Sequence, residues 1–299
     1  MNIEKWKKSN AESLSGKTIA VTGSTGGLGQ ALCAYLASLG ASLVLLDRNP
    51  IRSAAHKAFL SERCGADVKC ITLDLESLSS AEKAVSELTR IGIDIFIHNA
   101  GAYSIPRHKC ESGYGNVFQI NFATPYYMIK RLLPSLSERK GRVIAVGSIA
   151  HNYSRIDEKD IDFETRKAAS KVYGNAKRYL MYSLFELFKD ETEASLSIVH
   201  PGIAFTNITA HYPKLIFAVI KNPMKVIFMK PRKAALSILR GVFENTAYCE
   251  WIGPRWFDVW GFPKKKALKT ADADERTTIY RIAEEVYKKC AETVDRKTE

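Results

Sequence analysis

The sequence predicts an α/β protein with a doubly wound parallel sheet in a single domain. Short apolar runs alternate with amphipathic helical segments along most of the chain, the pattern of a parallel sheet covered by helices. One such run, residues 17–22, leads through a glycine-rich turn into a helical segment at 30–39. Hydrophobic residues make up 46% of the 299 residues, which is enough for one sizeable core. We therefore expect one domain over residues 16–299, preceded by a polar, basic extension of residues 1–15.

The glycine-rich turn at residues 23–29 has the chemistry of a dinucleotide cradle. Glycines permit a tight turn, a close approach of the backbone to a pyrophosphate and close packing of the following helix. A strand, this turn and a helix in succession predict a Rossmann-like binding unit, although an ordinary glycine-rich loop has the same composition. The residues expected at the cofactor are Gly23, Ser24, Thr25, Gly27, Leu28 and Gly29.

The second strand, residues 41–47, ends in Asp47, and Arg48 follows it. In a doubly wound fold, an acid at this strand end hydrogen-bonds the adenosine ribose and repels a 2′-phosphate, which favours NAD. Arg48 favours NADP, because a guanidinium group pairs well with a phosphate. We expect NAD, with NADP as the alternative. Asp47 is also compatible with a plain role as a helix cap or turn residue.

The remaining elements continue the alternation. Helices are expected at residues 52–64, 77–89, 112–133 and 271–289, and strands at 68–73, 93–98, 141–147, 195–200 and 249–252. Ser148 follows the strand 141–147 and so lies at its carboxyl end, where open α/β sheets bind their ligands. The aromatic run 256–262 is interpreted as the lining of an apolar pocket or of an oligomer interface.

Tyr173 and Lys177 form the candidate proton-transfer pair. Residues four apart lie on the same face of a helix, so the two side chains are neighbours. An ammonium group beside a phenol favours the phenolate and lowers the phenol pKa from its ordinary value of about 10. Tyr173 is therefore a candidate general acid and base. The spacing alone also occurs by chance on solvated helices.

Taken together, the motifs resemble the short-chain dehydrogenase/reductase family over residues 16 to 206. The resemblance is carried, in order, by Thr22-Gly23 to Gly29, His98-Asn99-Ala100-Gly101, Asn121, Ser148, Tyr173 with Lys177, and Pro201-Gly202. The separation of 25 residues between Ser148 and Tyr173 resembles the retinol-dehydrogenase-like branch. Two positions depart from the family pattern. His98 occupies a position where the family usually has Asn, and Gly147 occupies one where it frequently has Ser.

The resemblance implies roles for particular residues. Asn121, Ser148, Tyr173 and Lys177 would form the catalytic tetrad, with Asn121 kinking its helix and holding a water next to Lys177. Lys177 would also hold the ribose hydroxyls. The other implied cofactor contacts are Asp74 and Leu75 at the adenine, Asn99, Ala100 and Gly101 in the turn after the fourth strand, and Pro201, Ile203 and Thr206 at the nicotinamide. From the residues alone, Asp74 could equally cap a helix, and Asn99 could equally bridge two strands. His98 is expected to be a packed strand residue.

The resemblance also implies an activity. The chain would be an NAD(P)-dependent oxidoreductase that interconverts an alcohol and a ketone or aldehyde, with a lipophilic substrate of steroid, retinoid or long-chain type. We expect a homo-oligomer, either a dimer or a tetramer. The alternative from another class is a non-catalytic sensor or scaffold that binds the dinucleotide and signals through a partner.

Composition limits the partners and the location. The net charge is +12, but no zinc-finger or aromatic RNA-binding motif accompanies it, so no nucleic-acid partner is expected. Six scattered cysteines without CxxC spacing are typical of reduced thiols, and no metal site is expected. The N-terminus lacks a signal-peptide core, and no apolar run has spanning length. These features predict a cytoplasmic protein.

The segment 211–233 combines both components of a membrane-surface contact. It carries six basic residues and no acid, interleaved with apolar runs. One interpretation is a substrate lid whose lysines face water. The other is reversible attachment to an anionic bilayer surface, because basic and apolar side chains together favour that interface.

Overall fold

The computed structural model describes residues 2–203 and 229–296. These residues form one sheet of eight strands in the order β3-β2-β1-β4-β5-β6-β7-β8. The strands are β1 (Thr18–Thr22), β2 (Ser42–Asp47), β3 (Val68–Thr72), β4 (Ile95–His98), β5 (Arg142–Val146), β6 (Ser195–Val199), β7 (Glu250–Trp256) and β8 (Trp260–Ala267). Neighbours from β3 to β7 pair in parallel, and only β8 is antiparallel. The predicted doubly wound, mainly parallel sheet is confirmed.

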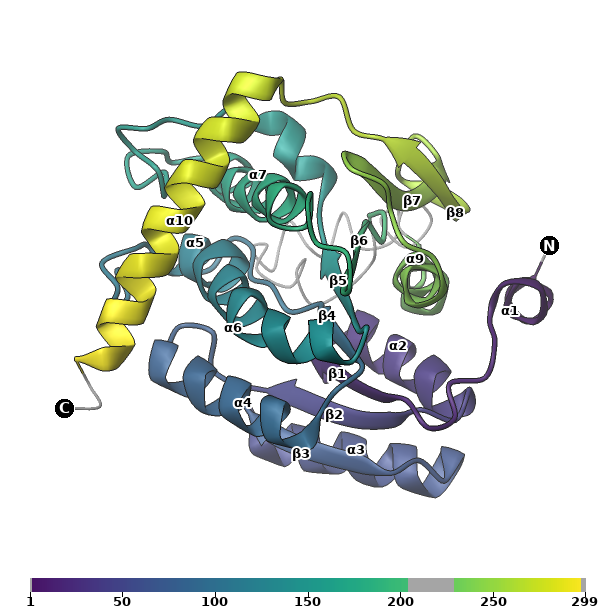
Figure 1. The fold of residues 1–299 in the computed structure, drawn as a ribbon. Coiled ribbons are helices and arrows are strands. Elements are labelled where there is room, and N and C mark those ends of the chain that lie inside the picture. Colours follow the sequence, from purple (N-terminus) through teal and green to yellow (C-terminus); the bar gives the residue numbers. More distant parts are fainter. Residues whose placement is uncertain (1, 204–228, 297–299) are drawn as a thin grey trace, which may run out of the picture.

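Helices cover both faces of the sheet (Figure 1). They are α1 (Ile3–Asn10), α2 (Gly27–Ser38), α3 (Pro50–Cys64), α4 (Leu78–Ile91), α5 (Asn116–Phe118), α6 (Thr124–Glu138), α7 (Ala169–Leu187), α9 (Pro231–Phe243) and α10 (Ala273–Asp295). A π-helical segment, η1 (Gln119–Ala123), joins α5 to α6, and a 3₁₀ turn, η2 (Ile149–Tyr153), follows β5. None of the helices in these described ranges is long and apolar enough to cross a membrane.

The sheet separates two hydrophobic cores. Ile19 and Val21 of β1 belong to the core under α2, α3 and α9, whereas Ala20 belongs to the core under α4, α6, α7 and α10. This division follows from the pleat, because successive strand residues point to opposite faces. A strand buried on both sides is apolar throughout, which is why the sequence shows continuous apolar runs instead of alternation.

Capping residues set the helix ends close to their predicted positions. The Asn49 side chain accepts from Arg52 N–H at the start of α3, and Ser77 does the same for Ser80 N–H at the start of α4. Both helices end at a glycine with positive φ, Gly65 and Gly92, which supplies the left-handed residue that such ends need. Ser77, and not Asp74, therefore caps α4.

Three regions differ from their predictions. The predicted helix 112–133 is three joined segments that continue to Glu138. The aromatic run 256–262 forms the turn and first residues of a β7–β8 hairpin, which was not predicted. Residues 1–15 contain α1, whose Trp6 is buried and stacks on Phe262 of β8. Propensity alone could not show that these segments find partners elsewhere in the chain.

Candidate active site

The strand order reverses between β1 and β4, and the candidate site lies where these strands end. In open α/β sheets the crevice at this switch point, outside the carboxyl ends of the strands, is the usual binding site. The glycine turn follows β1, Asn99 to Gly101 follow β4, and Ser148 follows β5. Tyr173 and Lys177 lie in α7, and Asn121 lies in η1.

Ser148 lies beside Tyr173, close enough for its hydroxyl to influence the phenol. Burial raises the pKa of Tyr173 to about 12, and the hydroxyl of Ser148 acts against that rise. The ring of Tyr103 meets Tyr173 edge-on, with ring centres 5.4 Å apart. The expected lowering of the phenol pKa is absent here, because desolvation is the largest effect and disfavours the charged phenolate. The phenol is therefore protonated at neutral pH.

Lys177 is almost completely buried beside Tyr173. Its Nζ donates to the carbonyl of Val146 at 2.9 Å and lies 5.7 Å from the ring centre of Tyr173. Burial lowers the pKa of Lys177 to about 7. The amine is held by the last residue of β5 and does not hydrogen-bond the phenol. Because its pKa is near neutral, it can gain or lose a proton near pH 7.

Asn121 fixes the turn after β4 against η1. Its Nδ2 donates to the carbonyls of Ala102 and Val117, each at 2.8 Å, and its Oδ1 accepts from Ala102 N–H at 3.2 Å. A Cβ on Gly101 would lie 2.8 Å from that Oδ1 and 3.7 Å from Lys177 Nζ, so the three residues converge. The π-helical segment is the local irregularity that brings Asn121 to this place, as often occurs at functional sites.

The glycine turn fits a dinucleotide pyrophosphate. Gly23 has φ +66°, and a Cβ on Gly29 would lie 2.2 Å from the Gly23 carbonyl, so the turn and α2 pack too closely for any side chain at Gly29. No side chain caps the start of α2, which begins at Gly27 after Gly26. Its first N–H groups and the positive end of the helix dipole are therefore available to an anion.

Asp47 has a different set of partners from the one expected. Its carboxylate is buried and accepts hydrogen bonds from Thr25 N–H (3.0 Å), Thr25 Oγ1 (3.0 Å), Ser24 Oγ (2.5 Å) and Ser53 Oγ (3.1 Å). Four donors occupy both oxygens, so in this conformation Asp47 orders the glycine turn and has no acceptor left for a ribose. The sequence did not indicate Ser53, which comes from the next helix.

Asn99 bridges β4 to β1. Its Nδ2 donates to the carbonyls of Thr22 (3.0 Å) and Gly23 (3.1 Å), and Thr22 Oγ1 accepts from the N–H groups of Asn99 and Ala100, both at 3.0 Å. Of the two roles left open for Asn99, the structure shows the bridging one. His98 is fully buried in β4, 3.3 Å from Thr22 Oγ1, as expected for a packed strand residue.

The other predicted cofactor contacts lie around the same edge. Asp74 Oδ1 accepts from Glu76 N–H at 3.0 Å, and Leu75 is buried with its carbonyl bonded to Thr124 Oγ1. The guanidinium of Arg48 is exposed and 4.0 Å from Glu76. In the turn after β6, Gly202 has φ +78° between Pro201 and Ile203. Thr206 lies outside the described residues, as do most residues of the segment 211–233.

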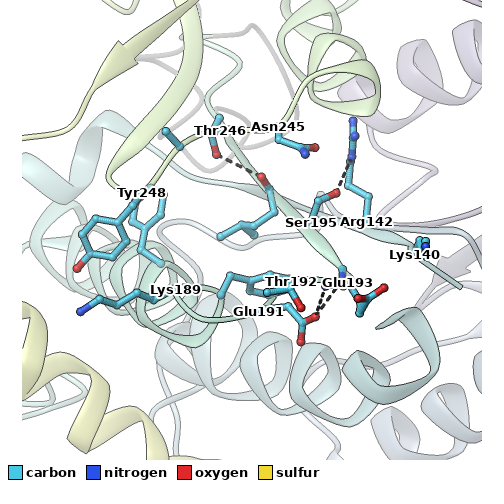
Figure 2. A pocket seen from close by; sticks show the side chains of 15 residues that line it. Lys140, Arg142, Lys189, Glu191, Thr192, Glu193, Ser195, Asn245, Thr246 and Tyr248 are labelled. Carbon is cyan, nitrogen blue, oxygen red and sulfur yellow. Dashed lines mark hydrogen bonds between the residues drawn. The ribbon is translucent and has the colours of Figure 1, made fainter. Parts of the chain in front are cut away.

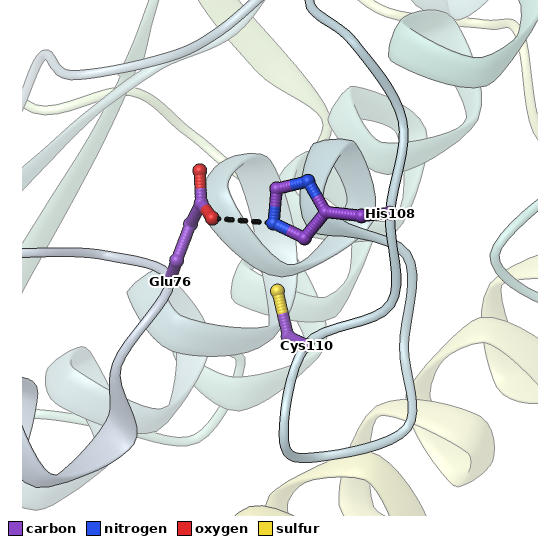
Figure 3. Close-up of side chains that lie close together, drawn as sticks. All are labelled: Glu76, His108 and Cys110. Atoms are coloured by element: carbon purple, nitrogen blue, oxygen red, sulfur yellow. Dashed lines mark hydrogen bonds and ion pairs between the residues drawn. The ribbon is translucent and has the colours of Figure 1, made fainter.

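Glu76, His108 and Cys110 come together near this edge (Figure 3). Their ligand-type atoms lie within 4.8 Å of one another, which was not foreseen because the three residues lack metal-ligand spacing. His108 Nε2 lies 2.8 Å from Glu76 Oε2, while Asn116 Nδ2 donates to His108 Nδ1 at 3.1 Å. The Asn116 bond places the ring proton on Nε2, which then donates to Glu76 and has no lone pair for a metal. Glu76 and His108 are accordingly a hydrogen-bonded pair in this conformation, with the Cys110 thiol beside them.

A cavity of about 500 Å³ lies at the opposite edge of the sheet (Figure 2). Its lining includes Lys140 and Arg142 at the start of β5, Ser195 at the start of β6, and Tyr248 before β7. These are the amino ends of the strands, far along the sheet from Ser148. We therefore place the chemistry at the carboxyl edge and not in this cavity.

The strand order, the glycine turn and the grouping of Ser148, Tyr173 and Lys177 are the features that the sequence predicts for a dinucleotide-binding oxidoreductase site. A short chain dehydrogenase family model matches residues 17–159. The chain belongs to the short-chain dehydrogenase/reductase family.

The chain is also similar to particular known proteins. The chain is similar to human retinol dehydrogenase 13, with 31% identity over 66% of this chain and 61% of that protein, so the match spans less than two thirds of that relative. It is 28% identical to human retinol dehydrogenase 14 over 87% of this chain and 82% of that protein. A solved structure of an uncharacterised protein from Mycobacterium paratuberculosis shares the fold, with a TM-score of 0.76 and 22% identity, and the match covers 94% of this chain and 96% of that one.

Proposed function

We propose that this oxidoreductase interconverts an alcohol and a ketone or aldehyde with a nicotinamide dinucleotide, and that Tyr173 is its general acid and base. The observation that carries the proposal is the grouping of Ser148 and Tyr173 beside buried Lys177. All three come from elements at the carboxyl edge of the sheet, where the glycine turn also lies. A dinucleotide held at that turn supplies or accepts the hydride.

The roles follow from donor and acceptor chemistry. In the reducing direction, Ser148 and Tyr173 both donate hydrogen bonds to the substrate carbonyl oxygen, and Tyr173 gives its proton to the forming alkoxide. A phenol that is protonated at neutral pH is in the correct state for this step. Lys177, with a pKa of about 7, is the proposed source of the replacement proton. That proton reaches Tyr173 through the water proposed beside Asn121, because the amine does not hydrogen-bond the phenol. In the oxidising direction the same groups act in reverse.

For the cofactor we propose NAD over NADP. The negative charge of Asp47 lies at the end of β2, where a 2′-phosphate would approach. Arg48, the residue that would favour the phosphate, is 4.0 Å from Glu76, which partly offsets its charge. Asp47 acts here through charge, since its hydrogen bonds are already made within the protein. Asp74, Leu75, Pro201, Ile203 and Thr206 complete the proposed cofactor contacts.

The substrate class and the assembly are also proposals. Similarity to proteins named retinol dehydrogenases supports a lipophilic alcohol or carbonyl compound. Residues 16–299 would form the catalytic domain, with 211–233 as its substrate lid. We further propose a cytoplasmic homo-oligomer that makes reversible contact with a membrane surface.

The substitution Tyr173→Phe tests the mechanism. It keeps the ring beside Tyr103 and removes the transferable proton, so turnover is expected to fall by at least about 100-fold. Cofactor binding should stay unchanged. The measurement is absorbance of the reduced nicotinamide with a panel of lipophilic alcohols and ketones. Tyr153→Phe, at an exposed tyrosine, is the matched control and should keep full activity.

Two outcomes would count against the proposal. Turnover by Tyr173→Phe at the level of the control would remove Tyr173 from the mechanism. Tight binding of the dinucleotide by the natural protein, with no turnover of any compound in the panel, would favour the sensor.

A further inference from the structure

The tip of the β7–β8 hairpin exposes three large aromatic side chains. Trp256 is 57% exposed, Phe257 83% and Trp260 42%. The other large exposed apolar side chains among the described residues lie outside the hairpin, on α3, on η2 and just before β7. Single exposed apolar residues need no explanation, but a cluster at a protruding tip indicates a contact surface.

The backbone of this tip is strained at Phe257, its most exposed residue. Phe257 and Asp258 have φ of +52° and +57°, and Val259 N–H donates to the Trp256 carbonyl at 3.0 Å. Two central residues with positive φ are the arrangement of a type I′ turn, which normally takes Asn and Gly. A left-handed conformation is unfavourable for a bulky residue such as Phe. Strain that persists at an exposed site is typical of a functional position.

Polar contacts hold the strained turn in place. Lys266 Nζ donates to Asp258 Oδ1 and to the Pro254 carbonyl, both at 2.8 Å. The buried ring of His200 lies with Nε2 3.0 Å from the Asp258 carbonyl. The tip is thus anchored from β8 and from the end of β6, and its aromatic side chains project from a fixed base.

Basic residues lie beside the aromatic tip. The Arg255 guanidinium is exposed and stacks over Trp256 at 5.3 Å. Next to it is a cavity of about 380 Å³, lined by Trp6, Asn10, Arg240, Arg255, Phe262, Pro263 and Lys264. None of these seven residues is acidic. Arg240 is paired with Glu244, whereas Arg255 and Lys264 are exposed. The surface therefore combines aromatic rings with two accessible positive charges.

The tip also lies next to the candidate active site. A Cβ on Gly202 would be 2.7 Å from the Val259 carbonyl and 2.9 Å from Pro254 Cγ, so the hairpin packs on the turn after β6. That turn is where the nicotinamide is proposed to pass. Figure 1 shows β7 and β8 at the far edge of the sheet from β3. Whatever binds the tip is held near the carboxyl edge of β6.

We propose that the tip of the β7–β8 hairpin docks on an anionic lipid bilayer, with Trp256, Phe257 and Trp260 in the interface and Arg255 and Lys264 at the lipid phosphates. Trp and Phe beside Lys and Arg are the side chains that an anionic membrane surface attracts. A second copy of the chain fits less well, because β8 is an edge strand that carries Pro263 and Lys264 to Lys266, which oppose strand pairing.

The test compares the natural protein with a variant carrying Trp256→Ser, Phe257→Ser and Trp260→Ser. Sedimentation is measured with vesicles of phosphatidylcholine, with and without phosphatidylserine. The natural protein should bind the anionic vesicles and be released by salt. The variant should bind at least about tenfold more weakly, since interfacial burial of one aromatic side chain already contributes about that factor. Arg255→Glu with Lys264→Glu should also weaken binding.

Control variants show whether vesicle binding belongs to the hairpin tip. Ile51→Ser with Phe59→Ser removes exposed apolar side chains of α3, on the other side of the sheet, and should bind vesicles as the natural protein does. Unchanged dinucleotide binding shows that the tip variant is folded. Tyr173→Phe should also bind vesicles normally, so that failure of the catalytic proposal is distinguishable from failure of this one.

Three results would overturn the inference. The first is equal vesicle binding by the tip variant and the natural protein. The second is vesicle binding lost with Lys221→Glu, Lys225→Glu and Lys230→Glu but retained by the tip variant, which would assign the contact to the segment 211–233. The third is a dimer that the tip substitutions dissociate in light scattering, without any vesicle binding, which would assign the surface to a second copy.

Discussion

At the scale of single residues, burial changes the chemistry that the sequence suggested. Tyr173 and Lys177 are neighbours on α7, as their spacing predicts. The structure adds that both are desolvated, which raises the pKa of the phenol to about 12 and lowers that of the amine to about 7. Each shift favours the neutral form. The pair is therefore set to donate a proton at neutral pH, and not to hold a phenolate.

The buried amine predicts a pH dependence of stability. The pKa of Lys177 in the folded protein, about 7, lies below its ordinary value of 10.5, so between these values the unfolded chain binds more protons. Stability must then rise with pH in this window. Lys177→Met removes the charge, so the variant should be the more stable protein at pH 7, and the difference should shrink towards pH 10. Thermal unfolding of both proteins without cofactor measures this. Parallel pH profiles would show that Lys177 is not desolvated.

Cofactor choice also depends on single residues. We expect the natural protein to bind NAD more tightly than NADP in titrations with each. Arg48→Ala should weaken NADP binding further and leave NAD binding unchanged, because only a 2′-phosphate needs the guanidinium. Asp47 is a poor target for this test, since its removal would leave Ser24, Thr25 and Ser53 without their acceptor. Tighter binding of NADP by the natural protein would contradict the preference for NAD.

At the scale of elements, local irregularities place the functional groups. The π-helical segment η1 brings Asn121 to the turn after β4. The glycine turn and α2 approach so closely that a Cβ on Gly29 would overlap the Gly23 carbonyl. The departure at Gly147 has a similar origin, because a Cβ there would lie 2.7 Å from Met181 Sδ. At both Gly29 and Gly147, close packing leaves no room for a side chain and so decides the residue.

The strained hairpin turn predicts a stabilising substitution. Asn tolerates positive φ far better than Phe, and Phe257 buries little, so Phe257→Asn should raise the free energy of unfolding by about 1 kcal/mol. Phe59→Asn makes the same change at an exposed helical position of α3 and should not stabilise. Thermal or denaturant unfolding compares the two. A loss of stability in Phe257→Asn would show that the turn is not strained.

At the scale of the whole molecule, two functional surfaces share the carboxyl edge of one sheet. The crevice beside β1, β4 and β5 holds the proposed chemistry, and the hairpin at the other end of the strand order carries the proposed lipid contact. A lipophilic substrate would then have a short path from the bilayer to Tyr173. The cavity at the amino edge is separated from both by the length of the strands.

The sequence by itself determined the alternation of strands β1 to β7 with most of the helices, the glycine turn and the residues that follow the strands. It did not indicate α1, α9 or β8. The features that it determined are encoded locally, in apolar runs, caps and glycines. The spacing of Tyr173 and Lys177 made them a candidate pair, and the resemblance to the family added the role of Ser148. Only the tertiary structure decided what Asp47 binds, how far Tyr173 and Lys177 are desolvated, and that β8 returns against β7. Those properties depend on groups far apart in the chain, such as Ser53 on Asp47 and Tyr103 on Tyr173, and no local pattern records which distant partner a side chain will meet.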